Sequence, residues 1–160
     1  MLRNGVPAPD FTLNNYDGAP WKLKSALGKP LALIFFRGRF CPTSDRFLAA
    51  YQDIMPRLKE LKISLVAISC DPLEEHRYLR DALRLSFPLL SDPNFSVCGA
   101  YGLYRVERGN GGSFCEPGVV VIDKDGRVAY SVISSGPKGL PSPGDLLPVL
   151  LYMFTHEGRY

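Results

Sequence analysis

Residues 31–45 read LALIFFRGRFCPTSD, an apolar run followed by a basic turn, a cysteine and the start of a helix. The run 31–36 has the length and the unbroken apolarity of a strand buried on both faces of a sheet that helices cover. From Thr43 onward apolar residues recur at helical spacing, and Pro56 is expected to kink that helix. The stretch therefore predicts a strand, a turn and a helix, with Cys41 at the turn.

The rest of the chain continues this alternation. The expected elements are an amino-terminal hairpin extension within 1–30, a strand at 63–69, a helix at 73–85, an extended piece at 87–90, a short helix at 95–101, a loop at 105–117, a hairpin at 118–133 around DKDG, and a last helix from the SPGD cap at 142–145. This order predicts an α/β fold with a mixed sheet, built as one domain over residues 1–160.

Composition excludes several function classes. Hydrophobic residues make up 46% of the 160 residues and charged residues 22%, so the chain should fold around an ordinary core. A net charge of +3 is too small to indicate a nucleic-acid or membrane partner. The longest apolar run has six residues and the start of the chain shows no secretory signal, so a cytoplasmic location with free thiols is expected. The spacing of the cysteines and histidines predicts no metal, and no cofactor is expected.

Cys41 is the strongest candidate for chemistry. It follows a buried strand and precedes a helix, where unpaired backbone N–H groups and the helix dipole favour a thiolate. The nearby Arg37, Arg39 and Arg46 act in the same direction, unless they are ordinary surface charges. The alternative for Cys41 is a small residue packed in the core.

The remaining cysteines and His76 have weaker local support. Cys70, Cys98 and Cys115 are expected to be buried and inert thiols. His76 lies in the charged stretch EEHR (74–77), which favours a solvated helix face over a catalytic base.

Six segments, in this order, resemble the peroxiredoxin family, also called the AhpC/TSA family. They are PAPDFTLNNYDG, GKPLALIFFRGRFCPTSD, VAISCDP, FPLLSDPN, AYGLY and GVVVIDKDGRVAYSV, and the resemblance covers about residues 4 to 150. It implies a thioredoxin-like three-layer α/β/α sandwich and a thiol-dependent peroxidase that reduces hydrogen peroxide or alkyl hydroperoxides. It also implies an antioxidant role, a thiol reductant such as a thioredoxin, glutaredoxin or glutathione, and a homodimer.

The resemblance assigns roles around Cys41, which matches the peroxidatic nucleophile within the string FCPT (40–43). Polarisation of the peroxide is assigned to Thr43, Ser44 and whichever of Arg37, Arg39 and Arg46 turns inward. The remaining residues of the expected active-site loop are Gly38, Arg39, Phe40, Pro42 and Pro117. Cys115 is a candidate resolving thiol; a cycle that uses Cys41 alone with an external reductant stays open beside it.

This chain departs from the family pattern at three points. Gly38 stands where peroxiredoxins typically have a threonine or serine, and Glu116-Pro117 replaces their second arginine. Pro117 resembles the cis-proline of thioredoxins, which faces the active cysteine. Ser44 replaces the second thiol of the thioredoxin CxxC motif. Two further functions therefore remain open: a monothiol thiol–disulfide oxidoreductase, and a binding scaffold in which Cys41 is chemically ordinary.

Overall fold

The structure is a computed structural model that describes residues 2–134 and 141–158. In chain order its elements are β1 (Thr12–Asn15), β2 (Pro20–Lys22), α1 (Leu23–Ala26), β3 (Leu31–Phe35), α2 (Pro42–Asp53), α3 (Met55–Glu60), β4 (Ser64–Ser69), α4 (Leu73–Leu83), β5 (Leu89–Ser91), α5 (Ser96–Ala100), β6 (Arg105–Glu107), β7 (Ser113–Cys115), β8 (Gly118–Ile122), β9 (Val128–Ile133) and α6 (Pro143–Thr155).

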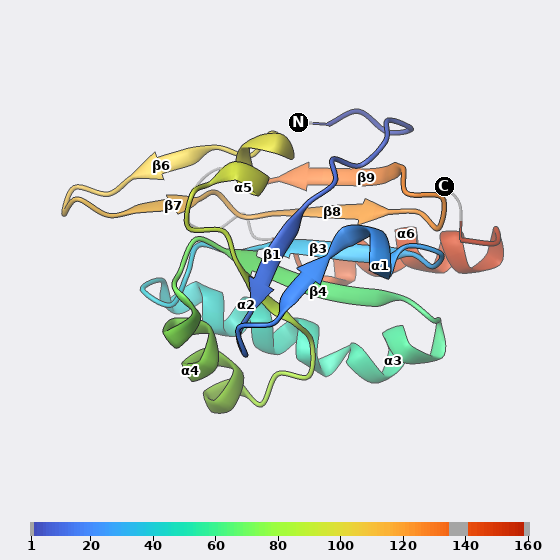
Figure 1. Cartoon of the computed structure of the whole chain (residues 1–160). Helices are drawn as coiled ribbons and strands as arrows, with labels where there is room; N and C mark the ends of the chain where they lie inside the picture. Colours follow the sequence, from blue (N-terminus) through green and yellow to red (C-terminus); the bar gives the residue numbers. More distant parts are fainter. Residues whose placement is uncertain (1, 135–140, 159–160) are drawn as a thin grey trace.

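A seven-stranded mixed sheet runs through the molecule in the order β2-β1-β5-β4-β3-β8-β9 (Figure 1). β3, β4 and β5 are parallel neighbours, whereas β8 lies antiparallel to β3 and pairs with β9 in the expected hairpin. β3 occupies a central position, and its residues are fully buried. The predicted α/β fold with a mixed sheet is confirmed.

The two faces of β3 belong to two different cores, because successive side chains of a strand point to opposite sides. Ala32 and Ile34 pack in a cluster with apolar residues of α2, α4 and α6. Leu33 and Phe35 pack in a second cluster with residues of α5 and of the amino-terminal segment. Helices and sheet therefore form three layers, and Figure 1 shows α2, α3 and α4 along one side of the sheet.

The helical expectations hold with small changes at the ends. The helix after Cys41 divides into α2 and α3 at Ile54, next to Pro56. The Ser142 and Asp145 side chains form a capping box at the start of α6, as the SPGD string predicts. Among the described residues, no helix combines the length and apolar character needed to cross a bilayer.

Two parts of the chain are more ordered than the sequence indicates. The amino-terminal hairpin β1–β2 extends the main sheet, because β1 pairs with β5. The loop predicted over residues 105–117 instead contains the antiparallel hairpin β6–β7, which projects beyond the end of the main sheet (Figure 1). A disulfide from β7 to α5 fixes this hairpin to the body of the protein.

Candidate active site

Cys41 is the residue that immediately precedes α2, and its backbone is extended with φ −98° and ψ 113°. The strand β3 ends at Phe35, and a turn from Arg37 to Phe40 reverses the chain. The Cys41 N–H donates to the carbonyl of Gly38 at 3.2 Å, and the Cys41 carbonyl accepts from the Ser44 N–H at 2.9 Å. The thiol thus lies at the start of a twelve-residue helix, as the sequence predicts.

The turn before Cys41 is held by Asp71, which follows β4 in the segment VAISCDP and to which the sequence assigns no role. Its Oδ2 accepts a hydrogen bond from the Arg39 backbone N–H at 2.7 Å. Gly38 has φ +127°, and a Cβ added there would lie 2.6 Å from Asp71 Oδ1. Both the backbone conformation and the close carboxylate require glycine at this position.

The Cys41 thiol is buried and hydrogen-bonded. Its residue is 9% exposed. Cys41 Sγ lies 2.9 Å from the Thr43 hydroxyl oxygen. Burial raises the pKa of Cys41, but the Thr43 hydroxyl and backbone N–H and the Arg37 guanidinium together outweigh it, so the pKa falls below the ordinary value. The surroundings therefore favour a thiolate.

The structure brings Arg37, rather than Arg39 or Arg46, to the thiol. The Arg37 side chain is 10% exposed and pairs with the Glu116 carboxylate, itself 13% exposed, at 3.2 Å. Its guanidinium also lies 5.5 Å from the centre of the Phe114 ring. The turn before α2 thus supplies the cation, while the hairpin β6–β7 and its exit supply the groups that hold it.

Arg39 and Arg46 lie outside this cluster. The Arg39 guanidinium pairs with Glu75 at 2.6 Å and stacks over the Tyr78 ring at 3.6 Å, on the surface of α4. Arg46 is exposed on α2. Ser44 is buried, and its backbone N–H contacts the carbonyl of Cys41 rather than the sulfur.

The aromatic residues near the site join the turn to the hairpin. The Phe40 ring lies 5.3 Å from the Phe114 ring, centre to centre, and the Arg108 guanidinium stacks over Phe40 at 3.9 Å. Phe114 therefore contacts both ends of the turn, at Arg37 and at Phe40. No local signal in the sequence marks Phe114, and Glu116 is noted there only as a departure from the family pattern, because the contacts of both residues depend on the fold.

The prediction that all four cysteines are free thiols is wrong for two of them. Cys98 and Cys115 form a disulfide, whereas the sequence predicts free thiols throughout. α5 and β7 bring these two residues together across 17 positions of sequence, a proximity that no local pattern encodes. Cys115 in this state has no thiol with which to resolve Cys41, and it stands between Phe114 and Glu116, the two residues that contact Arg37.

The prediction for Cys70 agrees with the structure, whereas that for Pro117 does not. Burial, with the Asp92 charge adding to it, raises the pKa of Cys70 to about 12, in line with an inert thiol. The cis-proline expected at Pro117 is absent, since none of the peptide bonds between described residues is cis. The Ser134 N–H donates to the Pro117 carbonyl at 2.9 Å, which joins this segment to the end of β9.

His76 is fully buried, so the expected solvated position is wrong. It faces the core with Leu79, one helical turn further along α4, while its charged neighbours face solvent. Nε2 shares a hydrogen bond of 2.7 Å with the Ser69 hydroxyl. Burial lowers the pKa of His76 to about 4, so this imidazole is neutral at physiological pH and serves the core rather than the site.

Comparison with known proteins identifies the family of this chain. The model of the AhpC/TSA family matches residues 4–131. Alkyl hydroperoxide reductase E of Mycobacterium tuberculosis is 30% identical over 134 residues, which cover 82% of this chain and 85% of that protein.

Solved structures agree in fold at lower identity. The crystal structure of peroxidoxin BcpB from Mycobacterium tuberculosis has a TM-score of 0.81 at 23% identity, over 98% of both chains. A cysteine-to-serine mutant of peroxiredoxin 6 from Arenicola marina has a TM-score of 0.86 at 16% identity, over 97% of this chain and 76% of that one. At these identities the likeness establishes the thioredoxin-like α/β fold.

Proposed function

Because this chain belongs to the AhpC/TSA family, we propose that Cys41 is the nucleophile of a thiol-dependent peroxidase that reduces hydrogen peroxide or alkyl hydroperoxides. The Cys41 thiolate attacks one peroxide oxygen and the O–O bond breaks. Cys41 becomes a sulfenic acid, and the departing oxygen takes a proton and leaves as water or an alcohol. The observation that carries this proposal is the thiol beside the Thr43 hydroxyl and the Arg37 guanidinium at a helix start.

The surrounding residues supply the stabilisation that this step requires. The Thr43 hydroxyl, 2.9 Å from the sulfur, stabilises the thiolate and then orients the peroxide oxygens. The Arg37 guanidinium stabilises the negative charge that develops on the departing oxygen. Glu116 and Phe114 are positioning residues, because they contact Arg37 and not the sulfur. We assign the polarising role to Arg37 rather than to the exposed Arg46. The polarising role of Ser44 remains a prediction from the family resemblance.

We propose that an external thiol returns Cys41 to its reduced form. One reductant thiol condenses with the sulfenic acid, which releases water and leaves a mixed disulfide, and a second thiol exchanges with that disulfide to free Cys41. The Cys98–Cys115 disulfide favours this route over resolution by Cys115. Thioredoxin, glutaredoxin and glutathione are the reductants to compare, in a chain that we expect to be cytoplasmic and homodimeric.

Mass spectrometry after one equivalent of peroxide tests the proposal. We expect one oxygen atom to be added at Cys41 in the wild-type chain, faster than in free cysteine, and no oxidation in Cys41→Ser. Cys70→Ser is the matched control, because it removes the other free thiol and should react as the wild type does. A rate no greater than that of free cysteine rejects the peroxidase. If Cys41 forms mixed disulfides but does not react with peroxide, the protein is a monothiol thiol–disulfide oxidoreductase. If Cys41 reacts with neither, the protein is a binding scaffold.

A further inference from the structure

A groove of about 940 Å³ lies at the opposite end of the sheet from Cys41. It is lined by Lys29, just before β3, and by the first residues of β4, whereas Cys41 follows the other end of β3. In the register of the two strands Leu31 pairs with Ser64, which lines the groove. The groove is thus separated from the thiol by about 15 Å, the length of a five-residue strand. Its volume is within the range of sites that hold small molecules.

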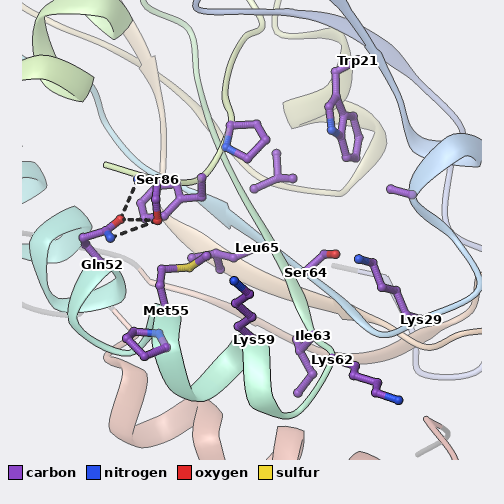
Figure 2. Close-up of a pocket in the computed structure, with 15 residues that line it drawn as sticks. Trp21, Lys29, Gln52, Met55, Lys59, Lys62, Ile63, Ser64, Leu65 and Ser86 are labelled. Atoms are coloured by element: carbon purple, nitrogen blue, oxygen red, sulfur yellow. Dashed lines mark hydrogen bonds between the residues drawn. The ribbon is translucent and has the colours of Figure 1, made fainter. Parts of the chain in front are cut away.

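The floor of the groove is apolar. Trp21 from β2 lies on one side and Met55 from α3 on the other, with Leu65 between them (Figure 2). Pro88 also lines the groove. Gln52 and Ser86 are polar, but they satisfy one another: the Gln52 Nε2 donates to Ser86 Oγ at 3.0 Å, and the Ser86 N–H donates to Gln52 Oε1 at 2.8 Å. A hydrocarbon ligand placed here would be removed from water without leaving these polar groups unpaired.

The rim of the groove is cationic. Lys29, Lys59 and Lys62 line it, and none of its fifteen lining residues is Asp or Glu. Within residues 2–134 and 141–158, none of these three lysines has a carboxylate oxygen within ion-pair distance, whereas Lys24 and Arg57 do. In Figure 2 the Lys59 amino group is turned toward Met55 and Leu65, and that of Lys29 toward Ser64. The positive charges thus border the apolar floor without an internal partner.

We propose that this groove binds a small amphiphile with one carboxylate and an apolar chain. The carboxylate lies between Lys29 and Lys59, and the chain lies along the floor toward Trp21. Unpartnered cations favour the anionic headgroup, and the apolar side chains favour the chain. This inference is independent of the peroxidase activity, because no residue of the groove is part of the Cys41 site.

Trp21 is the only tryptophan of the chain, so its fluorescence reports on the groove directly. Dodecanoate, titrated below its micelle concentration, should change this fluorescence saturably in the wild type and equally in Cys41→Ser. Dodecyltrimethylammonium, with the same chain and the opposite charge, should not bind. The doubly substituted Lys29→Gln, Lys59→Gln chain should bind about tenfold more weakly, since each rim cation contributes about threefold.

Arg57→Gln is the matched control for charge. Arg57 lies on the same helix as Lys59, but it pairs with Glu60 and does not line the groove. This variant should keep the wild-type affinity for dodecanoate. The proposal is overturned if dodecanoate gives no saturable change, if the double variant binds as the wild type does, or if an acidic peptide binds where dodecanoate does not. Circular dichroism confirms that each variant is folded before titration.

Discussion

Replacing Thr43 with valine tests whether its hydroxyl helps to hold Cys41 as a thiolate. Valine keeps the shape of threonine and removes the oxygen that lies 2.9 Å from Cys41 Sγ. A hydrogen bond to a charged group contributes about 1.5–3 kcal/mol. Because about 1.4 kcal/mol corresponds to tenfold, losing even the lower value reduces the thiolate population about tenfold at a pH well below the pKa.

The assay is the pH dependence of alkylation by iodoacetamide in a Cys70→Ser background. Cys98 and Cys115 are joined in a disulfide, so Cys41 is the one remaining thiol of the four cysteines. Only the thiolate reacts, and therefore the rate follows its population. We expect the Thr43→Val profile to move to higher pH.

Thr43→Ser is the control, because it keeps the hydroxyl and changes only the methyl group. It should alkylate as the parent protein does. An unchanged profile in Thr43→Val, or an equal displacement in both variants, would refute the role of the hydroxyl and leave Arg37 and the helix start as the sources of the lowered pKa.

Three further predictions concern other groups. Arg37→Met should slow the reaction of Cys41 with peroxide about 100-fold in stopped flow, whereas the exposed Arg46→Met should stay within about twofold; equal effects contradict the assignment. Replacing both Cys98 and Cys115 with serine opens a cross-link over 17 positions and should lower the unfolding free energy in urea by about 3 kcal/mol. The pKa of His76 is about 4 in the folded protein and about 6.5 in the unfolded chain. As the pH falls from 7.5 to 5, the unfolded chain takes up a proton at this histidine, and the free energy of unfolding should fall by ~2 kcal/mol. His76→Gln should remove that pH dependence, and a variant of the other histidine should keep it.

The elements around Cys41 could be predicted because their signals are local. The apolar run of β3 and the helical spacing after Thr43 are each contained in a short stretch, and they fix the position of the thiol. The groups that complete the site are distant in sequence: Glu116 reaches Arg37 across 79 positions, and Asp71 reaches Arg39 across 32. Such contacts depend on which strand ends meet, and periodicity carries no information about them.

The same distinction explains the errors at His76 and in residues 105–117. The charged residues beside His76 lie on the solvent-facing side of α4, whereas His76 lies with Leu79 on the side that faces the core. The glycines of residues 105–117 belong to the tip of a hairpin whose strands are held by the disulfide to α5. The spacing of four cysteines does not specify this cross-link.

The missing hydroxyl upstream of Cys41 follows from the packing of the turn. Gly38 stands where peroxiredoxins typically have threonine or serine, and the Asp71 carboxylate occupies the space that its Cβ would need. That carboxylate also holds the Arg39 N–H, so it cannot move away without releasing the turn. The hydroxyl beside the sulfur comes instead from the helix side of Cys41, where Thr43 Oγ1 lies 2.9 Å from it. Restoring threonine at position 38 should therefore disturb the turn, at a cost of about 1–3 kcal/mol, rather than improve catalysis.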